Sequence, residues 1–528
     1  MAGHGSESYF VIGEGLLTES GEGRATTPPA PPAPGARAPG ARAPAPPFRF
    51  MRMGPKGTQI GEANRKKLAA AMTAGGGGFG QIPAGFTYLG QFIDHDLTFD
   101  KTQLTLGANV SPSALLQGRS PTLDLDSLYG GGPQDPGSAK FYKDDRHLKM
   151  GKTEAVGGIS AKDGFDLPRA TTGQGKAVIP DKRNDENLAI AQTHLAFHRF
   201  HNRVVDDLPS GTPPAQRFSL ARESVAKHYQ WMIRHDYLPR ICQPSVVNDV
   251  FANGRKVFDV GATPTDVPAM PIEFSVAAFR FGHTMIRKTY AWNKEFPGEE
   301  GSLDLLFGFT GTSGFLGGGS KLPSNWIADW RRLYDFVADA GRANLKAPAG
   351  QFNHARRIDT LLADPLKILP RGAFGGAAAD EGTIRANLAF RNLTRAKMLK
   401  LATGQKLAAF IRSKGVNVPT LTAAQIRNGD GGADLGALTQ AQRKALVENT
   451  PLWFYVLREA ELNNGRLKGV GARVVAETFH RAMEGSQFSI VRDPAWRPSL
   501  GPDSTTFRMA HLLLFAFEGS KQLLAPLG

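Results

Sequence analysis

The chain has 528 residues, of which 41% are hydrophobic and 21% charged, so it is long and apolar enough to bury a large core. A net charge of +15 favours anionic partners, but the sequence lacks zinc-finger spacing, an RNA-binding aromatic signature and a continuous basic helix, which argues against nucleic acid as the main ligand. Its single cysteine, Cys242, excludes internal disulfides and cysteine-based zinc or iron–sulfur sites.

The first 47 residues are predicted to be a flexible arm. Residues 28–47 are almost entirely Pro, Ala, Gly and Arg, which cannot bury enough apolar surface to offset their ordering entropy. Such an arm could serve as a docking segment. No signal peptide and no apolar run of about 18 residues is visible, so we expect no membrane span. The compartment stays open between the cytoplasm and non-classical secretion.

Residues 48–528 are predicted to form one mainly α domain with long loops and little sheet. Strand-like alternation is scarce, and the glycine run Gly75–Gly78 marks a loop. Thr439 and Asn449 are predicted helix caps, with Pro451 opening the next helix. Apolar residues recur at helical spacing in six segments, namely residues 188–207, 219–237, 274–287, 384–400, 439–460 and 468–485.

The densest chemistry lies in the segment Tyr88-Leu-Gly-Gln-Phe-Ile-Asp-His-Asp-Leu97. On a helix, Gln91, Asp94 and His95 share one face, whereas Asp96 points about 100° away from His95. Two carboxylates flanking an imidazole are costly to bury without partners. Spacing alone leaves two interpretations open, a functional histidine and a core histidine with satisfied hydrogen bonds.

This segment resembles the distal motif of the animal-type haem peroxidase family. The resemblance implies a haem b cofactor, with His95 as the distal base and Gln91 beside it in the distal pocket. It also implies that Asp94 can form an ester link to a haem methyl group and that Asp96 is a calcium ligand.

A second segment, Asp181-Lys-Arg-Asn-Asp-Glu-Asn187, resembles the family's distal arginine motif. The match implies that Arg183 is the distal arginine and Glu186 the second ester-forming carboxylate. Asn187 stands where one branch of the family has a methionine bonded to haem, so no sulfonium link is expected. Without the other motifs, an exposed loop charge is the alternative interpretation of Arg183.

A third segment resembles the family's proximal helix, which holds the ligand of the haem iron. It is Glu273-Phe-Ser-Val-Ala-Ala-Phe-Arg-Phe-Gly-His-Thr-Met-Ile286. It implies that His283 ligates the iron and that Arg280 pairs with a haem propionate. Leu388-Ala-Phe-Arg-Asn-Leu-Thr-Arg395 is a shorter match. It implies that Asn392 accepts a hydrogen bond from the second nitrogen of the proximal imidazole and that Arg395 binds a propionate.

A further segment, Ser120-Pro-Thr-Leu-Asp-Leu-Asp-Ser-Leu-Tyr-Gly130, resembles the family's calcium loop. Hard oxygen ligands at alternating positions suit Ca²⁺, although a solvated acidic loop is the alternative. The implied ligands, together with Asp96, are Ser120, Thr122, Asp124 and Asp126.

Three histidines, His194, His198 and His201, lie three and four residues apart in the segment that follows the distal arginine motif. Such spacing can bind a metal, but no glutamate completes an HExxH pattern, so we expect no second metal site. Residues 450–480 also resemble the C-terminal helices of a bacterial-looking branch of the family.

The resemblance implies a haem peroxidase that reduces hydrogen peroxide and oxidises a small donor such as a halide, thiocyanate or a phenol. That reaction needs a base, a fixed cation and an electron-rich axial ligand, the roles implied for His95, Arg183 and His283. Two alternatives stay open, namely a fatty-acid dioxygenase of the same superfamily and a haem- or calcium-binding interaction protein without turnover. Cyclooxygenase-type oxygenases have a tyrosine where this chain has Arg280.

Overall fold

The computed structural model describes residues 48–102, 107–157, 164–171, 175–266, 268–311, 316–369 and 382–528. The predicted arm, residues 1–47, lies outside them. The described chain is mainly helical, which confirms the predicted fold class. Its α-helices are α1 (Glu62–Met72), α2 (Gly85–Leu97), α3 (Asp126–Tyr129), α4 (Leu188–Asp207), α5 (Pro214–Met232), α6 (Leu238–Ile241), α7 (Pro244–Asn253), α8 (Ile272–Ser275), α9 (Leu303–Gly308), α10 (Phe336–Ala340), α11 (Leu388–Met398), α12 (Gly404–Ser413), α13 (Ala423–Asn428), α14 (Gln440–Glu448), α15 (Leu452–Glu461), α16 (Gly469–Glu484), α17 (Met509–Ala516) and α18 (Lys521–Leu524).

Apart from isolated β-bridges, the described part of the chain has four two-stranded sheets. Such short ladders cannot hold a chain of this size, so helix packing carries the fold. The parallel pair joins residues just after the arm to the segment that leads into α8. The pairs are β1 (Arg49–Met51) with β5 (Ala269–Pro271), β2 (Phe79–Pro83) with β8 (His354–Arg356), β3 (Gly151–Lys152) with β4 (Phe165–Asp166) and β6 (Thr289–Tyr290) with β7 (Gly301–Ser302).

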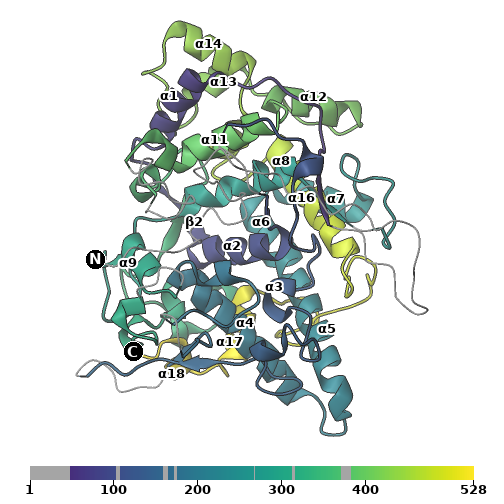
Figure 1. The fold of residues 1–528 in the computed structure, drawn as a ribbon, viewed down its shortest axis with the longest axis vertical. Helices are drawn as coiled ribbons and strands as arrows, with labels where there is room; N and C mark the ends of the chain where they lie inside the picture. The colour runs from purple at the N-terminus through teal and green to yellow at the C-terminus, as the bar shows by residue number, and fades with distance from the viewer. Residues whose placement is uncertain are drawn as a thin grey trace, which may run out of the picture.

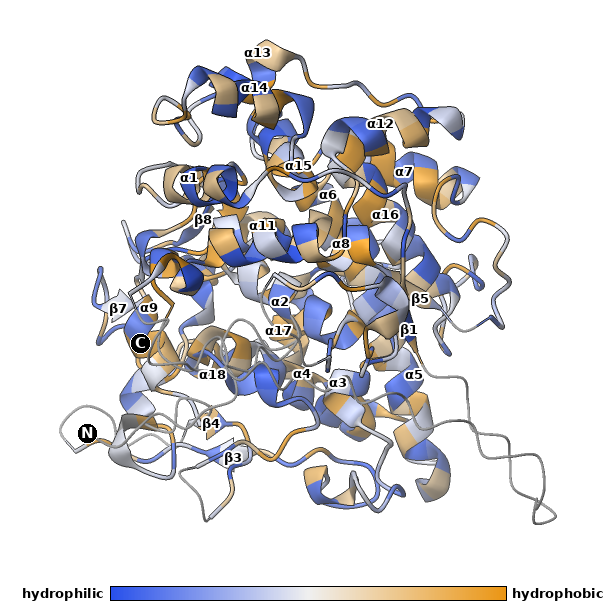
Figure 2. Cartoon of the chain, turned by 45° about the horizontal axis from the view of Figure 1, so that its top comes forward, coloured by the Kyte–Doolittle hydropathy of each residue, from blue (hydrophilic) through white to orange (hydrophobic). Residues whose placement is uncertain are grey.

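Helix α2 lies near the middle of the molecule, with α4 below it in the view of Figure 1. It packs against α4 and against the 3-10 helix η5 (Ala278–Met285). The rings of Phe92 and Phe197 stack at 4.4 Å between centroids and join α2 to α4. Apolar residues concentrate in inner helices such as α16 and α17, whereas the outer helix α14 is largely hydrophilic (Figure 2). The segment with the densest chemistry is therefore a core helix.

Helix α4 has the predicted bounds. Asn187 follows the preceding turn and is the N-cap of α4. The Asn187 side chain accepts a hydrogen bond from the Ile190 N–H, which satisfies one of the free donors at a helix start. Most of α4 is buried, including its three histidines. Asn187 therefore marks the point at which the chain passes from the segment that contains Arg183 into the core helix α4.

Two predicted helices are interrupted in the structure. Residues 219–237 form the end of α5 and then a π-helix, Ile233–Tyr237, that runs into α6. Pro239 lacks an N–H and cannot make an α-helical bond there, which favours the wider turn. Residues 274–287 fall into α8 and the 3-10 helix η5, separated by the non-helical Ala277.

The segment 439–460 contains two helices, α14 and α15. Thr439 caps α14 with a capping box, as predicted. Asn449 is also a cap, at the C-terminal end of α14, whereas Pro451 is the N-cap of α15 rather than its first residue. Residues 384–400 likewise divide into a short 3-10 turn and α11, with Asn387 as the cap.

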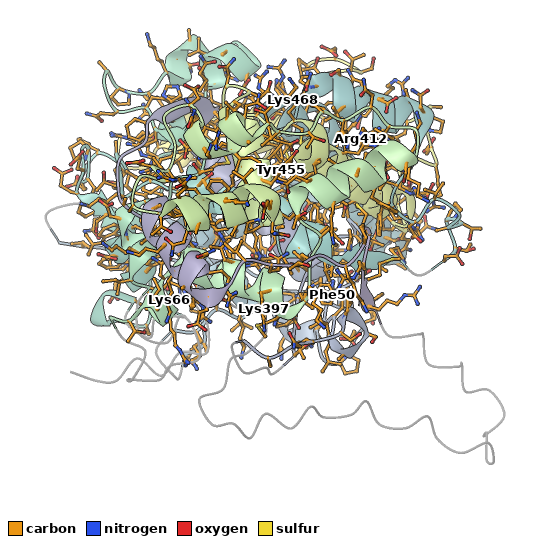
Figure 3. All side chains as sticks on the ribbon, turned by 90° about the horizontal axis from the view of Figure 1, so that it is seen from above. Phe50, Lys66, Lys397, Arg412, Tyr455 and Lys468 are labelled. Atoms are coloured by element: carbon orange, nitrogen blue, oxygen red, sulfur yellow. The ribbon has the colours of Figure 1, made fainter. Side chains whose placement is uncertain are left out.

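Within the described ranges, no helix is both long and apolar enough to cross a membrane. The basic residues labelled in Figure 3 are distributed over the surface. Lys66 on α1, Arg412 on α12 and Lys468 just before α16 are exposed and lie on different elements. These three positive charges therefore belong to separate elements of the chain.

Candidate active site

A cavity lies between α2 and η5, with about 780 Å³ of space that no protein atom fills, its mouth included. His95 lines it from α2 and His283 lines it from η5. The two histidines that the sequence singles out therefore meet one cavity from two elements. The other predicted residues that line it are Gln91, Asp94, Glu186 and Arg280.

The exposure pattern of both elements shows which sides face this space. In α2 all residues are buried except Gln91 and Asp94. In η5 the residues that keep accessible surface are Arg280, Gly282 and His283. All five line the cavity. The predicted common face of Gln91, Asp94 and His95 is therefore confirmed.

His95 is held through one ring nitrogen and leaves the other free. Its Nδ1 donates to Asn184 Oδ1 at 2.8 Å, and its Nε2 lies 3.7 Å from Glu186 Oε1. Burial, and next the positive charge of Arg183, lower the pKa of His95 to about 3. A neutral ring with its proton on Nδ1 presents a bare Nε2, which is the state a general base needs.

Arg183 lies next to His95 but is not one of the described residues that line the cavity. Asp181 binds its Nε and Nη2, and Nη2 also donates to the His95 carbonyl at 2.8 Å. These bonds hold the guanidinium behind the cavity wall. Its Nη1 is buried and has no acceptor among the described residues. Arg183 is thus a fixed buried charge rather than an exposed loop residue.

Two carboxyl groups share the distal side. Burial raises the pKa of Asp94 to about 6 and that of Glu186 to about 8, although Arg183 opposes both shifts. Gln91 connects the motifs, because its amide donates to Glu186 and its oxygen accepts from Asn187 Nδ2 at 3.1 Å. Asn187 therefore supports Gln91 at the position where a methionine would be needed for a sulfonium link.

His283 contacts Asn392, as predicted, but the amide is turned the other way. Asn392 Nδ2 lies 3.1 Å from His283 Nδ1, and Asn392 Oδ1 accepts from Arg280 Nη1 at 2.8 Å. The predicted acceptor is occupied because arginine only donates and needs an oxygen. Burial, followed by the charge of Arg280, lowers the pKa of His283 to about 3.

Positive charge accumulates on the proximal side. Burial and the nearby guanidinium groups of Arg395 and Arg391 lower the pKa of Arg280 to about 9. Arg395 does not line the cavity; it forms a buried ion pair with Asp100, while its Nε and Nη1 have no acceptor in the described chain. Three guanidinium groups, those of Arg280, Arg391 and Arg395, therefore lie near one another on this side.

The predicted calcium residues meet in one region, but protein donors already use several of their oxygens. Asp96 accepts from the Leu125 and Ser127 N–H groups, at 3.1 and 3.2 Å, and so points away from the cavity as predicted. Burial, followed by repulsion from Asp126, raises the pKa of Asp96 to about 7.

The loop itself is closed by short internal bonds. The hydroxyl groups of Ser120 and Thr122 form a hydrogen bond of 2.8 Å. The Thr122 hydroxyl donates to Asp124 Oδ2 at 2.7 Å, and the Ser486 hydroxyl donates to Asp124 Oδ1 at 2.5 Å. Among the described residues, no group of three or more His, Cys, Asp or Glu side chains is arranged to hold a metal ion. The structure therefore shows the predicted neighbours without a formed calcium site.

Two of the three α4 histidines bond to backbone carbonyls rather than to one another. His198 Nδ1 donates to the Lys149 carbonyl and His201 Nε2 to the Arg146 carbonyl, each at 2.8 Å. His194 Nδ1 accepts from Asn184 Nδ2 at 2.8 Å. The three rings therefore bond to separate partners.

Three residues near the cavity were not predicted from the sequence. Asn184 bonds to His95 but follows the more conspicuous Arg183, and Tyr88 and Tyr237 line the space. Tyr237 is placed by the π-helix, which no periodicity signals. A side chain at Gly90 would collide with the Tyr237 hydroxyl. The absence of a side chain at Gly90 is therefore explained by this close approach.

The model for the family "Animal haem peroxidase" matches residues 91–313. The match contains the residues that line the cavity from Gln91 to Ile286. Residues 91–313 of this chain thus correspond to an animal haem peroxidase domain. This confirms the family to which the sequence motifs were similar.

Curated relatives are similar in sequence to limited segments of this chain. A peroxidase-like protein of Margaritifera margaritifera is 29% identical over 113 residues, which cover 21% of this chain and 14% of the relative. Thyroid peroxidase of Canis lupus familiaris is 24% identical over 251 residues, which cover 41% of this chain and 26% of the relative. The chain thus matches about a quarter or less of these relatives.

Solved structures share the fold of the peroxidase domain at low identity. Peroxidase A of Dictyostelium discoideum superposes with a TM-score of 0.57 at 15% identity, covering 88% of this chain and 92% of its own. A fatty acid alpha-dioxygenase of Arabidopsis thaliana gives 0.55 at 12% identity, covering 90% and 77%. Peroxidases and dioxygenases share this fold, so fold alone does not separate the two activities.

Proposed function

We propose that the protein is a haem peroxidase that reduces hydrogen peroxide and oxidises a small anionic or phenolic donor. The proposal rests on one observation. His95, whose Nε2 carries no proton, and His283 line the same cavity from two different elements, α2 and η5. Residues 48–528 would form the peroxidase domain, since the superposition with a peroxidase covers most of the chain.

The residues around the cavity fit a haem. His283 Nε2 takes no part in the contact with Asn392, which uses Nδ1, so it is available for iron. Arg280 lines the cavity, and the nearby Arg395 has two buried N–H groups without acceptors among the described residues, so haem propionates would suit these two arginines. Bound haem would supply the redox-active iron that takes electrons from the donor and passes them to peroxide.

The distal residues perform proton transfer and charge stabilisation. His95 Nε2 would accept the proton of the inner peroxide oxygen and return it to the outer oxygen, which leaves as water. Arg183 would stabilise the negative charge that develops, because a fixed guanidinium in a buried site does so without reorganising. If Arg280 bound an anionic group of the cofactor instead, Asn392 could turn its Oδ1 toward His283 Nδ1 and hold the ring with Nε2 available as a ligand.

The test is turnover by the haem-loaded full-length protein. With hydrogen peroxide and guaiacol we expect donor oxidation, and with palmitic acid and oxygen we expect no oxygen uptake. The second assay is needed because the fold is shared with a dioxygenase and because Tyr88 and Tyr237 line the cavity. Oxygen uptake without peroxide turnover would favour the dioxygenase, and neither activity would favour a binding protein.

We also propose that Asp94 and Glu186 form ester links to haem methyl groups. Both carboxyl groups line the cavity, and their raised pKa values keep a protonated fraction near neutral pH. After incubation with peroxide, we expect haem to stay with the protein during acid–butanone extraction. Asp94→Val and Glu186→Gln should each remove one link, and the double variant should release haem completely. Complete release from the unmodified protein would exclude the esters.

We propose calcium binding at the loop of Ser120, Thr122, Asp124 and Asp126, with Asp96. The support is the repulsion among buried carboxylates, since burial and Asp124 also raise the pKa of Asp126. Ca²⁺ prefers such oxygen ligands. Excess EGTA is expected to lower the melting temperature by several degrees, and Ca²⁺ but not Mg²⁺ should restore it. An unchanged melting temperature would contradict the site.

A further inference from the structure

Asn184 connects the distal histidine to a second histidine in the core. His95 lies on α2, Asn184 in the short 3-10 turn Lys182–Asp185, and His194 on α4. Asn184 Oδ1 lies 2.8 Å from His95 Nδ1, and Asn184 Nδ2 lies 2.8 Å from His194 Nδ1. All three side chains are buried, with exposed fractions of 4% for His95 and 0% for the other two.

The direction of these two bonds fixes where the protons lie. An amide has one accepting end and one donating end, so a bare His194 Nδ1 requires the NH₂ group and turns Oδ1 toward His95. Oδ1 can only accept, so His95 must carry its proton on Nδ1. His194 stays uncharged, because burial and then the neighbouring His198 lower its pKa well below the ordinary value.

The opposite amide orientation would disable the base. With NH₂ facing His95 Nδ1, the His95 proton would move to Nε2, the nitrogen that must accept a proton from peroxide. A similar error of tautomer in serine proteases lowers turnover by about 10⁴. Which end of the Asn184 amide faces His95 therefore matters for catalysis, although Asn184 does not line the cavity.

We propose that Asn184 is a positioning residue that holds His95 in the tautomer with a bare Nε2, and that His194 orients the Asn184 amide. The proposal rests on the proposed function and deepens it. It also gives a role to the buried His194, whose Nδ1 bonds to the Asn184 amide. His194 Nε2 has no partner in the described chain, so Nδ1 carries the one bond of this ring.

The variants separate hydrogen bonding from packing. Asn184→Leu keeps the approximate shape and removes the acceptor, whereas Asn184→Asp keeps an acceptor for His95 Nδ1. With Asp at this position, His194 can donate from Nδ1 instead of accepting. His194→Asn retains a group that can accept from Asn184, and His194→Leu does not. His201→Gln, on the same helix but bonded to a backbone carbonyl, is the matched control.

The first measurement is the rate of reaction of the haem-loaded full-length protein with hydrogen peroxide. Asn184→Leu and His194→Leu are expected to lose about 10- to 100-fold, part of the 10²–10⁴ that general base catalysis contributes. The rate is expected to stay within about threefold of that of the unmodified protein in Asn184→Asp, His194→Asn and His201→Gln, a change that is small beside this loss. A rate of Asn184→Leu within that window would overturn the proposal. If the unmodified protein does not react with peroxide, the proposed function fails instead.

The second measurement does not depend on turnover. Nitrogen-15 NMR of histidine rings, with the His95 signals assigned by their loss in His95→Ala, reports which ring nitrogen carries the proton. In the full-length protein we expect His95 to be protonated on Nδ1, and in Asn184→Leu we expect a mixture of tautomers. A His95 proton on Nε2 in the unmodified protein would also overturn the proposal.

Discussion

Replacing His283 with alanine is expected to abolish ordered haem ligation and to lower peroxidase turnover by at least about 10³-fold, equivalent to about 4 kcal/mol. His283 is the cavity residue of η5 whose Nδ1 is engaged by Asn392 and whose other nitrogen remains available. Without it, haem would bind only through its propionates and the cavity walls. The absorption spectrum of the haem-loaded variant should therefore lose the Soret position of the unmodified protein.

Added imidazole provides the control for this variant. The ring removed by His283→Ala leaves a space in the cavity wall, so imidazole should restore the Soret position and part of the turnover. His354→Ala, which removes an exposed histidine, should behave like the unmodified protein. If His283→Ala keeps the original spectrum without imidazole, His283 is not the iron ligand.

Replacing His95 with alanine is expected to leave haem binding intact and to slow the reaction with peroxide by about 10²- to 10⁴-fold. Removal of the His95 ring should not disturb the proximal ligand, because His95 lies on α2 and its ring bonds to Asn184 rather than to His283. The loss corresponds to about 3–5 kcal/mol of transition-state stabilisation. Stopped-flow absorbance at the Soret band measures this rate directly.

The Soret spectrum of resting His95→Ala should match that of the unmodified protein, which distinguishes a missing base from a missing cofactor. His95→Gln should also be slow, since an amide cannot take a proton at neutral pH. A rate of His95→Ala equal to that of the unmodified protein would contradict the assignment of the base and favour one of the other cavity residues.

The sequence predicted the parts of this molecule that local rules control. Helix α4 has the predicted bounds because Asn187 caps it, and the common face of Gln91 and His95 follows from helical spacing alone. The break at Ala277 and the π-helix before Pro239 were missed. Apolar spacing reports which residues are buried, but it does not report a single turn that widens or a residue that leaves the helix.

The candidate site shows the same division. Family motifs pointed to the residues that line the cavity, but hydrogen-bond direction depends on side chains from distant segments. Arg280 takes the Asn392 oxygen, Asp181 holds Arg183 behind the wall, and Asn184 reaches His95. These contacts are set by tertiary packing, and no spacing within one segment encodes them.

The central claim is that iron lies between the rings of His95 and His283. Anomalous diffraction at the iron edge, from crystals of the haem-loaded full-length protein, locates the metal without reference to any assumed cofactor pose. We expect one strong peak inside the cavity, within bonding distance of His283 Nε2 and farther from the His95 ring. A peak outside this cavity, or one bonded to a different residue, would contradict the account.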